Sequence, residues 1–499
     1  MFKKRVNVLT RKSINELTRL RINVFKKLSG CKGTIFFRYD GKIPNFRYSP
    51  DGGKAIPLLE KKQRQTMNKT ICKSFCTALL LAAIPVAGAA QDDSTSNTSR
   101  LTIGGYGEAI YNYNFYSDNV FRYSHSDRYT QSKGHGRVDL PHAVIMLGYD
   151  FGHGWSIGTE VEFEHGGTEV AVEKETEETG EFEQEIERGG EVALEQFWVQ
   201  KHFSKGLNLR MGHIVVPVGM TNNNHTPDQF FTVYRPEGEN TIMPCTWHET
   251  GISLWGRSGS WRYEVQLLPG LNSNLFNESG WIHNGSASPY EFRPANSVAG
   301  AARVDFTGVE NLRLSLSGYV GNSFNNDITR AVYSEDSRYY GATGTVAIGA
   351  FDFAYRDRFV IVRGNADYGY LSDAGLISTR NKNQTTMTGN PYPHTAVGRN
   401  AWDASVEAGV NLLAWSKSRI GDPRLYLFGR YDRYDSFVPA AGFSDTPWAE
   451  RQVVTAGVNY YPLPQIALKA EAGMRILKAQ YNKEPYVAVG ITWCGFFKR

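Results

Sequence analysis

The ten residues from Trp155 to Glu164 read WSIGTEVEFE, and two kinds of side chain alternate along them. Odd positions carry Trp, Ile, Thr, Val and Phe, whereas even positions carry Ser, Gly and the glutamates Glu160, Glu162 and Glu164. Successive side chains of a β-strand point to opposite faces of the sheet. The stretch therefore predicts a strand with one largely apolar face and one acidic face.

Sixteen segments of about ten residues repeat this alternation. In two of them the polar face carries basic residues, because Arg313 alternates with leucines and Lys469 and Arg475 alternate with Ile, Leu, Ala and Met. A Lys or Arg facing mid-bilayer lipid costs about 2–4 kcal/mol, so we expect the charged faces to line a watery interior. The segments lie near 101–115, 137–150, 154–164, 190–203, 207–218, 249–258, 260–269, 297–307, 311–321, 341–354, 357–370, 401–415, 423–434, 451–461, 465–477 and 485–497.

The connections between these segments alternate between short and long. Short turns are expected at 151–153, 204–206, 308–310 and 462–464, and long loops at 116–136, 165–189, 219–248, 270–296, 322–340 and 371–400. Bacterial outer-membrane barrels have an even strand number, short periplasmic turns and long extracellular loops. The sequence therefore predicts an all-β fold, a 16-stranded antiparallel transmembrane β-barrel with short periplasmic turns and long extracellular loops. A barrel of that size encloses an aqueous channel.

The N-terminal region predicts export. Residues 1–66 form a basic extension with seventeen Lys or Arg against four Asp or Glu, and we interpret it as a mis-assigned start or a disordered segment. Residues 67–90 have a basic start, an apolar core and small residues before a cleavage site, as in a signal peptide, and 91–100 form a polar lead-in to the barrel at 101–499. Removal of 1–90 leaves a net charge of about −10, which removes the main support for nucleic-acid binding.

The third long loop, 219–248, is polar and rich in proline. Loops of this length inside a compact fold are uncommon unless they are functional. The stretches GGYGEAIYNYNF (104–115), GHIVVPVGMTNNNHTPDQF (212–230) and VYRPEGENTIMPCTWHETGISLWG (233–256) resemble porins of Bacteroidota related to the phosphate-selective porin O and P family. The resemblance covers about 101–499. It implies that the third loop folds into the pore and narrows it, and that the protein is a homotrimer.

Charged residues of the loop and of the inner strand faces are the candidate site. The expected pore constriction consists of Arg235, Glu237, Glu239, His248 and Glu249, which either form a charged narrowing or tether the loop to the wall by ion pairs. The expected pore lining consists of Glu160, Glu162, Glu164, Arg210, Arg262, Glu264, Arg303, Asp305, Arg313, Arg363, Asp367, Glu407, Lys469, Glu471 and Arg475. Rings of one charge sign can select ions, but this lining is mixed, so phosphate or anion selectivity and general or weakly cation-preferring transport both remain open.

Other motifs support no catalytic or metal chemistry. No G-x-S-x-G motif surrounds a plausible nucleophile, so we expect neither an enzyme nor a cofactor. His125, His135, His142, His153 and His165 show no metal-ligand spacing on any one element, so no metal site is assigned. The glutamate-rich run at 169–191 either collects divalent cations and bridges to lipopolysaccharide, or is a solvated loop tip.

Together these observations predict a passive porin of the outer membrane of a Gram-negative bacterium. It would pass small hydrophilic solutes or ions and contact outer-membrane lipid and lipopolysaccharide. A surface adhesin or structural barrel and, less favoured, a barrel enzyme are the alternatives. Cys245 and Cys494 are the two cysteines outside the removed segments, and we expect them at opposite ends of the barrel.

Overall fold

The computed structural model describes residues 100–129, 133–165, 169–174, 184–189, 192–288, 292–327, 332–383, 395–415, 422–478, 480–481 and 483–498. The basic extension, the signal peptide and all of the polar lead-in except Arg100 lie outside the described residues. Those three assignments stay predictions.

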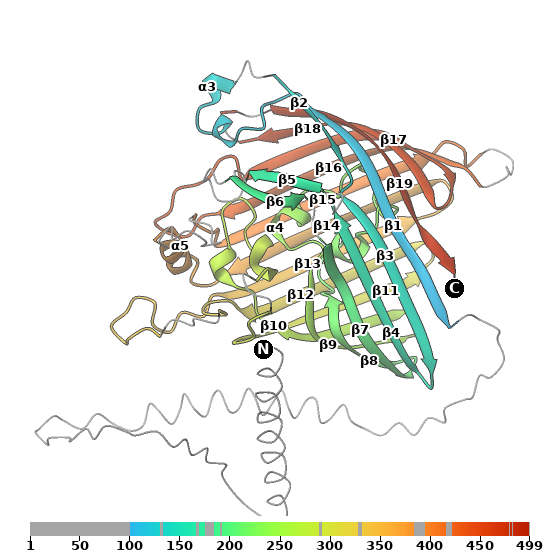
Figure 1. Ribbon diagram of the computed structural model, residues 1–499, viewed down its shortest axis with the longest axis horizontal. Coiled ribbons are helices and arrows are strands. Elements are labelled where there is room, and N and C mark those ends of the chain that lie inside the picture. Colours follow the sequence, from blue (N-terminus) through green and yellow to red (C-terminus); the bar gives the residue numbers. More distant parts are fainter. Residues whose placement is uncertain are drawn as a thin grey trace, which may run out of the picture. The chain divides into compact units, whose positions relative to one another are not determined.

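The strands close into one antiparallel barrel (Figure 1). Each wall strand pairs with its neighbours in sequence, and β19 pairs with β1 to complete the ring. The wall consists of β1 (Leu101–Asn114), β2 (His135–Asp139) with β3 (His142–Gly152), β4 (Trp155–Glu164), β7 (Val192–Ser204), β8 (Leu207–Val215), β9 (His248–Ser258), β10 (Trp261–Pro269), β11 (Val298–Val309), β12 (Leu312–Asn322), β13 (Thr345–Arg356), β14 (Val360–Leu371), β15 (Asn400–Asn411), β16 (Arg424–Val438), β17 (Glu450–Leu463), β18 (Ile466–Leu477) and β19 (Lys483–Lys498). The predicted 16-stranded antiparallel barrel is confirmed.

The second strand of the wall is divided into β2 and β3, whereas the sequence predicts one continuous strand at 137–150. β3 pairs with the first half of β1 up to Gly107, and β2 pairs with its second half from Ile110. Pro141 lies between them, and proline has no backbone N–H to donate to a strand ladder. A further difference is a two-stranded hairpin, β5 (Glu169–Lys174) with β6 (Gln184–Gly189), within the second long connection.

The two faces of the wall differ as the alternation predicts. The outer face exposes large apolar side chains, for example Ile145, Leu316 and Val489. The inner face buries polar ones, and Glu160 and Glu162 are only 3% and 2% exposed. Burial of charged side chains on the inner face requires partners there, and a long loop supplies many of them, as described below.

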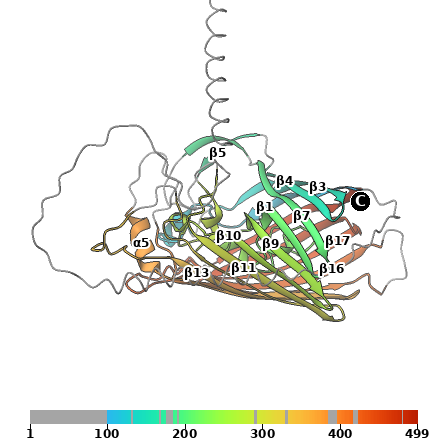
Figure 2. The ribbon, with the colours of Figure 1, turned by 90° about the horizontal axis from the view of Figure 1, so that it is seen from below.

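Short helices and packed loops occupy the end of the barrel where the long connections gather. They are η1 (Val120–Arg122), α3 (Ser126–Tyr129), α4 (Glu239–Ile242), η3 (Ser273–Leu275), η4 (His283–Ser286) and α5 (Ala374–Lys382). A further short helix, η2 (Asn222–Asn224), lies inside the barrel, where Asn224 meets Arg313 near the start of β12. Figures 1 and 2 both show α5 at this end. Within the described residues no helix is long and apolar enough to cross a lipid bilayer.

The main apolar core lies among these loops and the inner strand ends. Trp247 packs on Tyr319 with ring centroids 4.9 Å apart, and Trp281 and Phe276 are completely buried in the same cluster. The indole nitrogen of Trp281 donates to the carbonyl of Gly398 at 3.0 Å. The loops at this end are thereby packed against the wall and against one another.

Candidate channel lumen

The segment Gly219–Trp247, here called the inner loop, leaves the wall where β8 ends at Val215. Gly219 adopts a φ of 81°, and a Cβ there would lie 2.2 Å from Oε1 of Glu239, so only glycine fits this turn. The carboxylate of Glu239 accepts hydrogen bonds from the backbone N–H groups of Met220 at 2.7 Å, Thr221 at 3.1 Å and Asn222 at 3.0 Å. Glu239 therefore holds the start of the inner loop folded.

The carbonyl groups of the inner loop are held by one lysine of the wall. Nζ of Lys469, on β18, donates to the carbonyl oxygens of Pro227 at 2.7 Å, Phe230 at 3.0 Å and Thr232 at 2.9 Å. Lys469 is 2% exposed, and these three acceptors take up all the protons of its ammonium group. The neighbouring Glu471 accepts from the N–H of Val233 at 2.8 Å.

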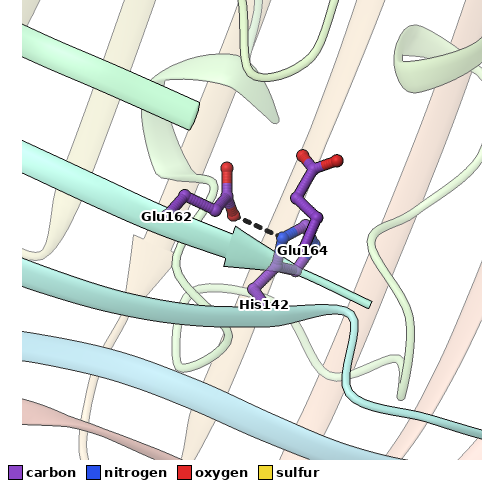
Figure 3. Close-up of side chains that lie close together, drawn as sticks. All are labelled: His142, Glu162 and Glu164. Carbon is purple, nitrogen blue, oxygen red and sulfur yellow. Dashed lines mark hydrogen bonds and ion pairs between the residues drawn. The ribbon is translucent and has the colours of Figure 1, made fainter. Parts of the chain in front are cut away.

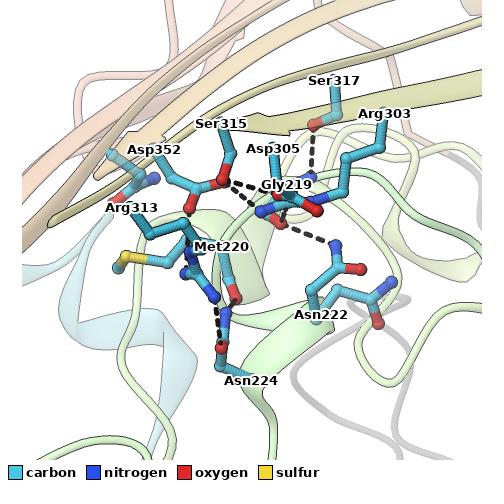
Figure 4. Close-up of polar contacts among 12 residues, drawn as sticks. Gly219, Met220, Asn222, Asn224, Arg303, Asp305, Arg313, Ser315, Ser317 and Asp352 are labelled. Carbon is cyan, nitrogen blue, oxygen red and sulfur yellow. Dashed lines mark hydrogen bonds and ion pairs between the residues drawn. The ribbon is translucent and has the colours of Figure 1, made fainter. Parts of the chain in front are cut away.

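An arginine cluster on β11, β12 and β13 holds the start of the inner loop from another side (Figure 4). Arg303 donates through Nη1 to the carbonyl of Gly219 at 2.9 Å and through Nη2 to Asp352 at 2.8 Å. Arg313 donates to Asp352 at 3.1 Å and to the side-chain oxygen of Asn224 at 3.2 Å. The inner loop thus contacts the inner faces of β11, β12 and β18.

Glu237 ties the later part of the inner loop to β16 and β18. Its carboxylate pairs with Arg475 and accepts from Tyr434 Oη at 2.7 Å. Burial disfavours the charged carboxylate, but Arg475 outweighs this effect and lowers the pKa of Glu237 to about 2. Arg475 also pairs with Glu484 at 2.6 Å, so one guanidinium joins the loop to two strands.

Three adjoining cavities run along the inner loop from the long-loop end to the short-turn end. The outer cavity, of about 370 Å³, shares Tyr116, Arg137 and Arg475 with a middle cavity of about 200 Å³. The middle cavity shares Pro236 and Arg430 with an inner cavity of about 410 Å³. Arginines recur along all three: Arg122, Arg137, Arg451 and Arg475 in the outer, Arg235 and Arg430 in the middle, and Arg313, Arg356 and Arg363 in the inner.

The opposite wall is acidic and carries histidines. His142 Nδ1 lies 2.5 Å from Oε1 of Glu162, and Glu164 lies beside this pair (Figure 3). A separate cavity of about 370 Å³ is lined by Glu162 and Glu164, and also by His248, whose Nδ1 lies 2.5 Å from Nε2 of His213. The charges that alternate in the sequence are therefore partly sorted in space. Arginines recur along the three adjoining cavities, the middle one of which Glu237, Asp432 and Glu471 also line, whereas Glu162, Glu164 and His248 line the separate cavity together with Arg293.

The five predicted constriction residues have three different positions. Arg235 and Glu237 line the middle cavity. Glu239 is 2% exposed, and its carboxylate accepts hydrogen bonds from backbone N–H groups of the inner loop itself. His248 and Glu249 line the separate acidic cavity, where Glu249 pairs with Arg293 at 2.8 Å.

Most of the predicted lining residues are held by neighbours on the inner face. Their partners are Gln200 for Arg210, Ser253 for Glu264, Asp305 and Glu264 for Arg262, Asp305 for Arg303, Asn365 for Asp367, and Glu407 together with the carbonyl of Gln229 for Arg363. Of these, Arg363 lines the inner cavity. The arrangement combines structural ion pairs with a smaller set of residues that border open space.

Several residues of the site were missed by sequence reasoning. Arg430 stands on the polar face of β16 two residues before Asp432, its ion-pair partner at 2.6 Å, and the period-two pattern could have found both. Glu195 could not be found this way, because the register between β4 and β7 shifts between Glu160 and Val161. Such a bulge breaks the alternation on which the assignment depends.

No protein-family model matches this chain. A protein of Aquifex aeolicus (strain VF5), described as uncharacterized, is 26% identical over 402 residues, which is 79% of each chain. Among solved structures, an anion-selective porin from Comamonas acidovorans has a TM-score of 0.44 at 11% identity and covers 79% of this chain and 99% of its own. The outer membrane channel DcaP of Acinetobacter baumannii has a TM-score of 0.45 at 12% identity, covering 80% and 99%. Salmonella typhi OmpF in complex with daunomycin has a TM-score of 0.46 at 9% identity, covering 79% and 97%. The solved structures to which this chain is similar thus include a porin and an outer membrane channel.

Proposed function

We propose that this protein is a passive diffusion channel of the outer membrane, through which small hydrophilic solutes and ions cross along the inner loop. The observation that carries the proposal is the series of three cavities that share lining residues from one end of the barrel to the other. A closed barrel with an apolar outer face and a polar inner face suits a bilayer with water inside. Transport of this kind needs no cofactor.

The inner loop sets the width of the channel in this proposal. The middle cavity has about half the volume of either neighbour, and Tyr234, Arg235, Pro236 and Glu237 of the loop line it. Its opposite side is formed by wall residues such as Arg430 and Asp432. A solute passing from the outer to the inner cavity would meet its narrowest point here.

In the same proposal, the arginines that line the three cavities make the channel prefer anions to cations. Arg137 in the outer and middle cavities and Arg356 in the inner cavity have no acidic partner at ion-pairing distance within the described ranges. Fixed positive charges without counter-ions attract anions, and a water-filled path lined by them selects by sign. The acidic wall, with Glu162 and Glu164, borders a different cavity. Anion preference is therefore favoured over the general or weakly cation-preferring transport that a mixed lining leaves open, and a phosphate-selective channel is one form of it.

Planar-bilayer recording tests the proposal. The purified full-length protein is expected to give stable open-channel conductance, and a KCl gradient is expected to give a reversal potential of the sign for chloride preference. R137Q and R356Q remove unpaired charges and should each move the reversal potential toward zero. R433Q is the matched control, since Arg433 pairs with Glu450 at the surface. Well-inserted protein without conductance would refute the channel and leave the adhesin or the barrel enzyme. Open-channel conductance with a preference for cations would refute the proposed anion preference but not the channel function.

The outer-membrane location, the homotrimer and contact with lipopolysaccharide are further parts of the proposal. The exposed apolar side chains on the outer face, such as Leu316 and Val489, suit contact with lipid acyl chains or with a second protomer. Membrane fractionation and native mass spectrometry of the detergent-solubilised protein test location and subunit number. Recovery in the inner membrane, or a monomer at all detergent concentrations, would contradict these parts.

A further inference from the structure

Three potential metal ligands meet where the inner loop touches the acidic wall. Glu160 on β4, Glu195 on β7 and His225 after η2 each offer one ligand atom, and the three atoms lie within 4.8 Å of one another. They come from three separate elements, which explains why spacing along the sequence did not indicate a site.

The tautomer of His225 follows from its backbone contact. Nδ1 of His225 lies 3.0 Å from the carbonyl oxygen of Asn222, and a carbonyl can only accept, so Nδ1 carries a proton and donates it. In the neutral imidazole, Nε2 then presents a lone pair toward the carboxylate of Glu160, at 3.8 Å from its Oε1. A lone pair facing a carboxylate is unfavourable unless a cation or a second ring proton lies between them.

The atoms that face this point lack hydrogen-bond partners. Nε2 of His225 and Oε1 of Glu160 are both buried and unpaired among the residues with described positions, and Glu160 is only 3% exposed. Burial of an unpaired carboxylate oxygen is costly, so the arrangement points to a missing partner. Arg235 does not supply it, because its Nη2 approaches Glu162 at 4.0 Å and has no hydrogen-bond partner itself.

The remaining atoms of the ligands are oriented as in protein metal sites. Gln196 donates to the other oxygen of Glu160, and Tyr106 Oη donates to Oε2 of Glu195 at 3.4 Å. Metal-binding histidines usually donate their second ring N–H to a carbonyl or a carboxylate, as His225 does to Asn222. Two ligands of a tetrahedral zinc ion lie about 3.4 Å apart, so the 3.8 Å gap closes with a small side-chain movement.

We propose that Glu160, Glu195 and His225 bind one divalent transition-metal cation, which fastens the inner loop to β4 and β7. An imidazole with two carboxylates suits Zn²⁺ and its first-row neighbours better than Ca²⁺ or Mg²⁺, which prefer oxygen ligands alone. The acidic cavity lined by Glu162, Glu164 and Glu195 gives the cation a route from solvent to the site. The proposal does not depend on the channel function.

Zn²⁺ uptake by the purified full-length protein tests the site. After treatment with a chelator and its removal, equilibrium dialysis with metal analysis is expected to show one tightly held Zn²⁺ per chain. E160Q keeps the contact with Gln196 and removes the charge, and H225Q removes the imidazole. Each is expected to weaken binding by more than the roughly 10- to 100-fold that loss of an outer-shell partner costs, because each removes a ligand of the cation. H202Q is the matched control, because His202 lies on the same strand as Glu195 and bonds Asn208 outside the cluster.

Four results would overturn the assignment. Absence of stoichiometric Zn²⁺, or equal uptake by wild type, E160Q and H225Q, would leave only a protonated imidazole paired with carboxylates. Preference for Ca²⁺ over Zn²⁺ would show that carboxylates bind without His225. X-ray absorption of the zinc-loaded wild type needs no variant to fold, and it is expected to show imidazole and oxygen scattering without sulfur. A spectrum without imidazole would also refute the site.

Discussion

Replacement of Lys469 by methionine tests how the inner loop is held. Methionine keeps most of the side-chain volume but removes the three hydrogen bonds from Nζ to the carbonyls of Pro227, Phe230 and Thr232. Hydrogen bonds to charged groups contribute about 1.5–3 kcal/mol each. Relief of the cost of burying an ammonium group offsets several kcal/mol of that sum. The free energy that holds the inner loop on the wall therefore falls by roughly 2–4 kcal/mol, which raises the population of the released loop by roughly 30- to 700-fold.

Hydrogen exchange and single-channel recording measure this release. The N–H groups of Phe231, bonded to Glu407, and of Val233, bonded to Glu471, are expected to exchange faster in K469M by a factor in that range. Open-channel current is expected to increase and to fluctuate more. K201M is the control, because Lys201 contacts His153, Trp155 and Phe203 and, within the part of the chain that the structure describes, makes no hydrogen bond to the inner loop. Unchanged exchange of the loop amides in a correctly folded K469M barrel would refute the anchoring role of Lys469.

Three further predictions follow from single features of the structure. G219A places a side chain at a φ of 81° and a Cβ 2.2 Å from the Glu239 carboxylate. It is expected to cost about 1–3 kcal/mol of loop stability and to speed hydrogen exchange of the Asn222 amide. An exchange rate equal to that of wild type would contradict the steric argument. The Glu237 carboxylate has its pKa lowered to about 2, so the stability that its charge contributes is fully present above the ordinary glutamate pKa and is lost as pH falls toward 2. The difference in urea midpoint between wild type and E237Q should therefore be constant above pH 5 and shrink below pH 4. Cys245 and Cys494 are both free thiols, so the unfolded exported protein should react with two equivalents of a thiol reagent without prior reduction; none would indicate a disulfide, and five would indicate that the N-terminal segments are retained.

The sequence is sufficient to predict the strands of the barrel wall but not the contacts between side chains inside the barrel. Alternation places Glu160 and Lys469 on the inner face because strand geometry repeats every two residues. It could not place His225 beside Glu160, because that meeting depends on how an irregular loop folds across the barrel. Pro141 carries a local signal for the break between β2 and β3, since proline cannot donate to the ladder. The position of Glu195 depends on a bulge, which pairing between two distant segments creates.

The wall holds the inner loop mainly by its backbone. Lys469 binds three carbonyls, Glu471 and Glu407 accept from main-chain N–H groups, and Arg303 donates to the carbonyl of Gly219. Every residue type offers a carbonyl and all but proline offer an N–H, so these contacts survive most substitutions in the loop. Position and chemistry of the loop are therefore separable. The side chains at 234–236 that line the middle cavity can be exchanged, by natural variation or by protein engineering, to give the same barrel a different permeant while the loop keeps its path.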